Sequence, residues 1–266
     1  MRLIIATLLT LVAGPALACG SDTDCTVLDG DRTYRYYMPD TVEGPIGAVF
    51  HAHGYRGSAD GAMRNQSLRA MADRLGMALI ALNADADDWN LAYRPREPQQ
   101  AEAREYDYVT AVIEDVADRI DLDRERMIAT GFSAGGMMTW TLACGMGDTF
   151  AGVVPYSGTF WRSIPPTCPT PATNMIHIHG DADTVVPLEG RAIGPTRQGN
   201  VYDALAMYAE HGAQPEAVLA EMPEGLSCFL RENVDGLLLD FCLFDGTHAY
   251  SATRVEWAIN RILDRL

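Results

Sequence analysis

The sequence has few basic residues for its number of acidic ones. It contains 20 Lys and Arg against 36 Asp and Glu, so the formal net charge of the 266-residue chain is −16. A nucleic-acid-binding protein needs a basic surface to meet the phosphates, so this composition argues against nucleic acid as a partner. The same charge would repel anionic polymers and membranes, which makes a neutral substrate easier to accommodate. An acidic surface kept for solubility explains the composition equally well.

Long apolar runs are also scarce, and internal repeats and linkers are not evident. One apolar stretch, over residues 3–12, follows Arg2 and precedes Ala16-Leu17-Ala18. This order of a basic residue, a short apolar segment and an A-x-A site is typical of a signal peptide, and the stretch is too short to favour a membrane span. We therefore expect a signal peptide over residues 1–18, one domain over residues 19–266, and a secreted or periplasmic protein.

Cysteine supplies a second indication of export. Cleavage after Ala18 would leave Cys19 first, so a lipid-anchored protein is an alternative, less favoured because Ala16 stands where a lipobox usually has Leu. An even number of cysteines in an exported chain predicts disulfides, and all six lie in residues 19–266. Many connectivities are possible. Order along the chain favours three local pairs: Cys19 with Cys25, Cys144 with Cys168, and Cys228 with Cys242.

Strand-like and helix-like segments alternate along most of the chain. The expected strands are 33–38 (an edge strand), 48–52, 77–82, 127–130, 152–156, 174–179 and 237–244, and the expected helices are 68–75, 103–120, 134–143, 201–211 and 252–266. Proline breaks the intervening segment 157–173, which we expect to be a loop or small cap. This alternation predicts a single α/β domain with a mostly parallel sheet and helices on both faces.

The segment Gly131-Phe132-Ser133-Ala134-Gly135 follows an apolar run and precedes a helix-like stretch. It fits G-x-S-x-G, the nucleophile elbow, in which two glycines permit a tight turn that exposes the serine hydroxyl. The alternative is that this segment is a glycine-rich turn from a strand to a helix with no catalytic role.

A serine hydroxyl is a poor nucleophile near neutral pH. To react, it needs a base within hydrogen-bond distance and a third group that orients the base. His248 follows a predicted strand in a Gly-Thr-His loop, and Asp183 follows another strand in the pattern H-G-x-x-D. The resulting order, Ser133, Asp183, His248, is the order of α/β-hydrolases. Asp181 is a competing acid.

Two backbone donors should hold the oxyanion that forms during acyl transfer. We expect Ala134, directly after the serine, to supply one N–H group and Tyr55, in the loop after the strand 48–52, to supply the other. The Tyr55 ring is either a wall of the acyl pocket or an ordinary surface aromatic.

Two H-x-H pairs, His51 with His53 and His177 with His179, could suggest a metal site. Zinc needs a third protein ligand, which the sequence does not offer, so we predict no metal. The acidic loop around Asp87 lacks the spacing of an EF-hand. The predicted chemistry uses no cofactor.

Three motifs together resemble one group of proteins: GFSAGGMM at 131–138, HIHGDADTVVP at 177–187 and GTHAYS at 246–251. They are similar to the secreted polyhydroxybutyrate depolymerase-like and feruloyl or acetylxylan esterase group of the α/β-hydrolase superfamily. The resemblance implies an α/β-hydrolase fold, with Ser133 as nucleophile, Asp183 as acid and His248 as base. The histidine of this family commonly lies in a G-G-H-x-W-P segment, whereas residues 245–251 of this sequence read DGTHAYS. This departure concerns the substrate side of the pocket more than the three catalytic residues.

The function expected from these features is an exported serine esterase that cleaves a small or oligomeric ester through an acyl-enzyme. The aromatic side chains of Trp89, Trp161 and Tyr250 are the predicted substrate contacts. A serine peptidase of the same fold is one alternative. A non-catalytic exported binding protein is another, although it would be expected to have lost one of the three catalytic positions.

Overall fold

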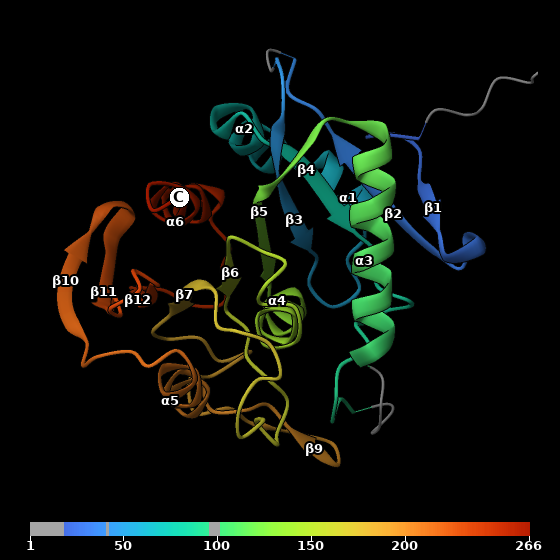
Figure 1. Cartoon of the computed structure of the whole chain (residues 1–266). Helices are drawn as coiled ribbons and strands as arrows, with labels where there is room; N and C mark the ends of the chain where they lie inside the picture. Colours follow the sequence, from blue (N-terminus) through green and yellow to red (C-terminus); the bar gives the residue numbers. More distant parts are fainter. Residues whose placement is uncertain (1–18, 41–42, 96–101) are drawn as a thin grey trace, which may run out of the picture.

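The computed structural model describes residues 19–40, 43–95 and 102–266, and the predicted signal peptide at 1–18 lies outside them (Figure 1). A ten-stranded sheet runs through the domain in the order β1-β2-β4-β3-β5-β6-β7-β12-β11-β10. Its strands are β1 (Cys25–Val27), β2 (Arg32–Tyr37), β3 (Ile46–Ala52), β4 (Ala78–Leu82), β5 (Leu122–Phe132), β6 (Gly152–Tyr156), β7 (Asn174–Gly180), β10 (Val218–Met222), β11 (Leu226–Leu230) and β12 (Leu239–Phe244).

Six α-helices and a small hairpin complete the fold in the part of the chain that the structure describes. The helices are α1 (Ala59–Arg64), α2 (Gln66–Leu75), α3 (Glu102–Arg119), α4 (Ala134–Gly145), α5 (Val201–His211) and α6 (Ala252–Leu263). The hairpin pairs β8 (Ala192–Ile193) with β9 (Thr196–Arg197). Short 3-10 turns occupy Leu28–Gly30 and Pro223–Gly225.

The central strands β4, β3, β5, β6, β7 and β12 are parallel, and antiparallel strands flank them on both sides. The prediction of a mostly parallel sheet with helices on both faces is confirmed. The prediction that 33–38 forms an edge strand is wrong, because the three-residue strand β1 pairs outside β2. The short elements β1, α1, β8 and β9 and the hairpin β10–β11 escaped prediction, since segments this short or this exposed carry little periodicity.

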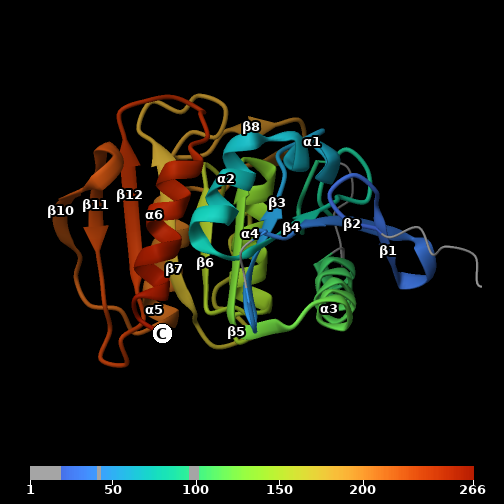
Figure 2. The same cartoon turned by 90° about the horizontal axis from the view of Figure 1, so that it is seen from above.

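Two apolar cores lie on opposite faces of the sheet. On β3, Phe50 points into the core shared with α3, α4 and α5, whereas Val49 points into the core shared with α1, α2 and α6. Successive strand residues face opposite sides, so a strand covered on both faces is apolar throughout. Figure 1 shows α2 and α6 above the sheet with α4 and α5 below it, and Figure 2 shows α1, α2 and α6 in front.

Three disulfides pair all six cysteines, and they are the three local pairs favoured by chain order. Because Cys19 Sγ is bonded to Cys25 Sγ, the same sulfur is not available in this structure for a lipid thioether.

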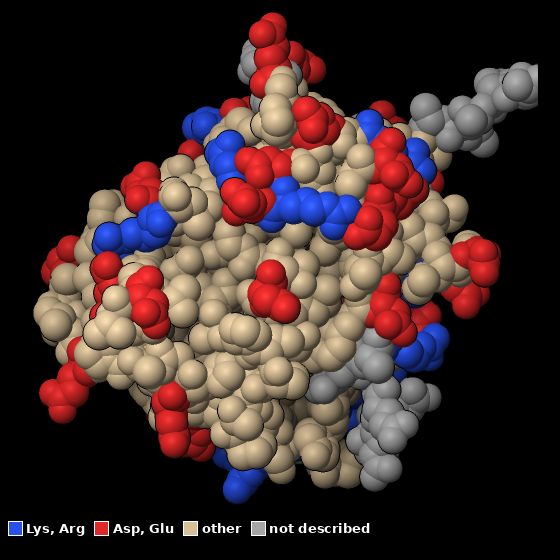
Figure 3. All heavy atoms as spheres, in the orientation of Figure 1, with Lys and Arg blue, Asp and Glu red and all other residues tan. Residues whose placement is uncertain are grey.

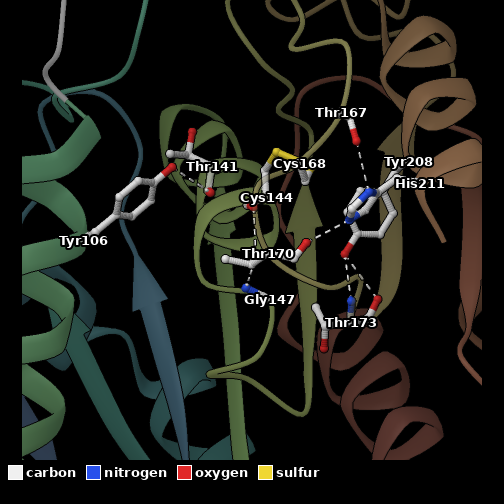
Figure 4. The surroundings of a disulfide bond; sticks show 10 residues. All are labelled: Tyr106, Thr141, Cys144, Gly147, Thr167, Cys168, Thr170, Thr173, Tyr208 and His211. Carbon is white, nitrogen blue, oxygen red and sulfur yellow. Dashed lines mark hydrogen bonds between the residues drawn. A yellow bond between two sulfur atoms is a disulfide. The ribbon is translucent and has the colours of Figure 1, made fainter.

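The Cys144–Cys168 bond joins the end of α4 to the 157–173 loop (Figure 4). Beside it, Thr170 Oγ1 donates to the Cys144 carbonyl at 2.9 Å and accepts from Gly147 N–H at 2.9 Å. His211 Nε2 donates to the Thr170 carbonyl at 2.9 Å. The loop is therefore fastened to both α4 and α5.

Acidic groups stand out among the charged side chains on the face drawn in Figure 3, as the net charge of −16 requires. Some acidic groups are paired: Arg74 meets Glu256 at 2.6 Å, and Arg124 meets Glu114 at 2.7 Å. Within the described part of the chain, no helix combines the length and apolar character needed to cross a membrane.

Candidate active site

The predicted site residues follow four strands of the parallel part of the sheet, in which β3 lies beside β5, β7 lies beside β12, and β6 separates the two pairs. Tyr55 follows β3, Ser133 follows β5, Asp183 follows β7 and His248 follows β12. Carboxyl ends of parallel strands meet at one edge, which is where open α/β sheets bind ligands. The sheet therefore gathers at one edge residues that lie up to 193 positions apart in sequence (248 − 55).

Ser133 occupies a strained turn between β5 and α4. Its backbone has φ 59° and ψ −118°, its N–H donates to the Tyr156 carbonyl at 2.9 Å, and its carbonyl accepts from Met137 N–H at 3.0 Å. A Cβ on Gly135 would overlap the Ala52 carbonyl, and one on Gly131 would overlap the Gly135 carbonyl. Both positions therefore require glycine, because the backbone of Gly135 packs against the end of β3 and that of Gly131 packs against the first turn of α4. The G-x-S-x-G pattern predicts this requirement.

Asp183 is buried and bonded on both carboxylate oxygens. Oδ2 accepts from His248 Nδ1 at 2.6 Å, and Oδ1 accepts from Val185 N–H and Val186 N–H, both at 2.8 Å. Burial alone would raise the pKa of Asp183, but these donors hold the pKa below its ordinary value. Asp181, the competing acid, instead accepts from Gly246 N–H at 3.1 Å. Of the two candidate acids, Asp183 is the one that bonds to His248.

The bond to Asp183 sets the orientation of His248. With its proton on Nδ1, the neutral ring keeps Nε2 as the acceptor that a general base requires. The ring packs on Phe132, the neighbour of Ser133, with 4.6 Å between centroids. Within the described residues, Ser133 Oγ and His248 Nε2 do not form a hydrogen bond; such contacts commonly tighten only when substrate binds.

The two residues expected to supply the oxyanion donors lie near Ser133. Ala134 is the first residue of α4, so its N–H has no acceptor within the helix and lies at the positive end of the helix dipole. The loop after β3 passes close to the serine, since a Cβ added to Gly54 would lie 3.6 Å from Ser133 Cβ. Tyr55 follows Gly54 and lines a cavity together with Ser133 and Ala134. The two expected oxyanion donors thus border the same space.

This cavity has a volume of about 380 Å³. Its wall includes Tyr55, Ser133, Ala134, Met137, Trp161 and Gln198. Of the three aromatic residues predicted to contact substrate, Trp161 is the one that lines it.

Trp89 and Tyr250 lie elsewhere. Trp89 is fully buried, and its Nε1 donates to the His53 carbonyl at 2.9 Å, so it supports the Tyr55 loop from behind. His53 supports the same loop, with Nδ1 donating to the Gly54 carbonyl at 2.8 Å and Nε2 accepting from Ala84 N–H at 3.2 Å. Tyr250 lines a separate pocket of about 220 Å³ with His51. A substrate contact does not fit the fully buried position of Trp89. Tyr250 packs on Phe132, 5.6 Å between ring centroids, and its substrate contact stays a prediction.

Comparison with known proteins adds three similarities. The profile of the Phospholipase/Carboxylesterase family matches residues 90–215. NocK of Nocardia uniformis subsp. tsuyamanensis, named as an esterase, is 32% identical over 169 residues, which are 62% of this chain. The chain spans about half the length of NocK, 48%. A protein of Aspergillus niger named as a feruloyl esterase C is 25% identical over 232 residues, covering 82% of this chain and 76% of that protein.

Among solved structures, the acetyl xylan esterase from Aspergillus awamori superposes with a TM-score of 0.63 over 89% of this chain and 98% of that one, at 16% identity. The chain has the α/β-hydrolase fold. The resemblance to the α/β-hydrolase esterase group that the three motifs indicated is thereby confirmed.

Within this fold, a buried chain of hydrogen bonds that the sequence did not indicate links α4 to the loop of Asp183. Trp140 Nε1 donates to His177 Nδ1 at 3.0 Å, His177 Nε2 donates to His179 Nδ1 at 3.0 Å, and His179 Nε2 donates to the Val186 carbonyl at 2.8 Å. Each bond fits a neutral ring protonated on Nε2.

Burial lowers the pKa of both histidines, which keeps them neutral as this chain of bonds requires. All four ring nitrogens of His177 and His179 are engaged in hydrogen bonds, so this H-x-H pair has a structural role. The pair ties the helix that begins at Ser133 to the loop that carries Asp183.

Proposed function

We propose that this α/β-hydrolase is an exported serine esterase with Ser133 as nucleophile, His248 as general base and acid, and Asp183 as the residue that orients His248. The observation that carries the proposal is the 2.6 Å bond between His248 Nδ1 and Asp183 Oδ2 beside the elbow of Ser133. The names of the similar proteins, which are esterases, support the same reaction class.

In the proposed reaction, Ser133 Oγ attacks the ester carbonyl while His248 Nε2 takes its proton. Asp183 stays ionised and stabilises the resulting imidazolium. The N–H groups of Ala134 and Tyr55 bind the oxyanion. His248 returns the proton to the leaving alcohol, and the acyl group remains on Ser133. Water then attacks the acyl-enzyme carbonyl and gives a proton to His248. His248 passes this proton to Ser133 Oγ as the acyl–oxygen bond breaks, which releases the acid and restores the hydroxyl and the neutral base.

The proposed substrate is a neutral carboxylic ester with a small to medium acyl group. A cavity of about 380 Å³ with the apolar side chains of Met137, Val186 and Ile193 in its wall fits such a group. Hydroxyalkanoate, feruloyl and acetyl esters are the candidates that the family resemblance suggests. Export is supported by the three disulfides, which persist in oxidising compartments.

Replacing Ser133 with Ala tests the assignment. The variant should lose hydrolysis of p-nitrophenyl butyrate by about 10⁴-fold or more, and it should no longer form a covalent adduct with an alkyl fluorophosphonate, as read by intact mass. Ser227→Ala is a matched control, because the Ser227 hydroxyl bonds Glu221 on the outer strands, away from the elbow. Retained activity in Ser133→Ala would refute the proposal.

The matched anilide of the same acid separates an esterase from a peptidase. An esterase should cleave the ester far faster than the anilide. Comparable rates on the two substrates would favour the peptidase alternative.

A further inference from the structure

A second cavity adjoins the one beside Ser133, and its volume is also about 380 Å³. Its wall is mostly aromatic and apolar, with lining residues that include Tyr93, Tyr106, Phe160, Trp161, Ile164 and Pro166. None of the described residues in this wall carries a charge. The first cavity differs, because its wall also holds Asp88, Arg94 and Arg191. The second cavity is therefore the better environment for a hydrocarbon chain.

The two cavities follow one another along α4. Ala134 and Met137 line the first cavity, whereas Thr141 and Cys144, drawn in Figure 4, line the second. Spacings of three and four residues place all four on one face of the helix, and at a rise of about 1.5 Å per residue they span about 15 Å. The segment 91–95 also borders both spaces, since its first three residues line the second cavity and its last two line the first. The second cavity therefore continues the first along the helix that begins at the nucleophile.

Trp161 stands between the two cavities. Among the described lining residues, it is the one that both cavities share, and it is 8% exposed. The backbone before it is held because the Phe160 carbonyl accepts from Gly199 N–H at 2.7 Å. The backbone after it is held because Arg162 N–H donates to the Arg197 carbonyl at 2.8 Å. The indole ring is therefore a wall attached to a backbone that is bonded on both sides.

The first cavity lies on the acyl side of the proposed reaction centre. Its wall contains Ser133 together with Tyr55 and Ala134, the proposed oxyanion donors, whereas His248 is not among its described lining residues. The leaving alcohol must receive a proton from His248, so the alcohol occupies the His248 side and the acyl group occupies the first cavity. Burying charged groups against hydrocarbon costs free energy, so the tail of an apolar acyl group should lie along α4 rather than against the charged part of the wall. That path leads to Trp161.

From these observations we infer that Trp161 limits the length of the acyl group, because its ring closes the first cavity against the apolar second cavity. The inference rests on the proposed esterase function and deepens it. It names a substrate class, esters of acyl groups short enough to end at Trp161, and a residue that excludes longer ones. Without the ring, the two cavities would form one groove along α4, in which each additional buried methylene group favours binding by about fourfold.

The test compares p-nitrophenyl butyrate with p-nitrophenyl dodecanoate. In the native enzyme kcat/KM should be higher for the butyrate. In Trp161→Ala the ratio of kcat/KM for the dodecanoate to kcat/KM for the butyrate should rise by at least about tenfold, because several methylene groups enter the second cavity. Trp161→Leu, which keeps an apolar side chain, serves as a second variant if the first folds poorly.

A second substitution shows whether the space gained is the second cavity. Ile164 lines that cavity and is not part of the first one. Ile164→Trp, combined with Trp161→Ala, should fill the second cavity with a large ring and return the ratio toward its native value. Ethyl butyrate and octyl butyrate test the other half of the ester. Their relative kcat/KM should stay native in Trp161→Ala, because the alcohol lies on the His248 side.

Trp257→Ala is a matched control for the loss of an indole ring. Trp257 lies on α6 and packs against the core on the opposite face of the sheet, and it is not among the described lining residues of either cavity. This variant should keep the native ratio of dodecanoate to butyrate.

Five outcomes would count against the proposals. An unchanged acyl-length ratio in active Trp161→Ala, or native hydrolysis of the dodecanoate as fast as that of the butyrate, would overturn the inference. A ratio that stays high in the double variant would also overturn it, because the space left by the ring alone would then explain the change. A shift in the alcohol series, or an equal rise of the ratio in Trp257→Ala, would overturn it as well. Activity that survives Ser133→Ala would instead refute the proposed function.

Discussion

Asp183→Asn is the most informative perturbation of the proposed catalytic site. The carboxylate accepts three hydrogen bonds, two on Oδ1 from the N–H groups of Val185 and Val186 and one on Oδ2 from His248 Nδ1. An Asn in the same rotamer keeps Oδ1 as the acceptor of the first two bonds but presents its NH₂ group to His248. Two donors would then face each other at the present 2.6 Å separation.

His248 can relieve this conflict by moving its proton to Nε2. Nε2 then faces Ser133 as a donor and cannot take the serine proton. Losing the base in this way costs about 10⁴-fold in kcat, equivalent to about 5 kcal/mol of transition-state stabilisation. The free energy of unfolding should change far less, because losing one charge-assisted bond is partly offset by removing a buried charge.

The assay is kcat and KM for p-nitrophenyl butyrate, with thermal unfolding measured on the same preparations. Asp181→Asn is the matched control, since its contact is a backbone N–H at 3.1 Å that an Asn oxygen can still accept, and it should lose less than about twofold. Asp183→Asn keeping more than a tenth of native kcat, or Asp181→Asn losing as much as Asp183→Asn, would refute the reasoning.

Three further predictions concern stability. Removing the disulfide with Cys144→Ala and Cys168→Ala should lower the free energy of unfolding by about 3 kcal/mol, because the bond closes a loop with a sequence separation of 24; a urea titration showing a loss below about 1 kcal/mol would contradict this. Burial lowers the pKa of His51 to about 4 in the folded protein, whereas its pKa in the unfolded chain is about 6.5. Between these two pH values the unfolded chain binds a proton that the folded protein does not. The free energy of unfolding therefore falls as the pH falls, by at most about 3 kcal/mol. His51→Phe should therefore show a smaller drop in Tm from pH 7.5 to pH 5, and an equal drop in the two proteins would exclude His51 as a cause. Gly135→Ala should be expressed in a poorly folded form or lose activity by more than about 100-fold, because the added methyl overlaps the Ala52 carbonyl, and a native-like Tm with native kcat would show that the elbow tolerates a side chain.

The architecture of the central sheet was predictable from local patterns. Strands such as β3 and β4 are buried on both faces and therefore read as continuous apolar runs, and α5 was predicted with its observed bounds. The outer strands were not predictable. On β10, Val218 and Leu219 are largely exposed, so the alternation of apolar and polar residues that identifies a half-buried strand is missing there.

The residues of the candidate site also differ in how well the sequence predicts them. Chain order and strand ends indicated Ser133, Asp183 and His248, and their roles stay a prediction until the variants are assayed. Aromatic residues offered no comparable guide: Trp89 and Trp161 look alike in sequence, yet one supports a loop from behind and the other lines the cavity.

By itself, the sequence determined features that depend on neighbours along the chain: the glycine-bounded turn of Ser133 and the alternation of strands and helices. For the cysteines it only favoured pairs in chain order among many possible connectivities, and the structure has those pairs. Only the tertiary structure decided which side of each loop faces the cavity, and which buried polar groups pair. It closed the hydrogen bonds from Trp140 to Val186 and left Gln198 Oε1 without a hydrogen-bond partner among the described residues. The physical reason is that such contacts join segments brought together by packing, and the spacing of residues within each segment carries no record of its partner.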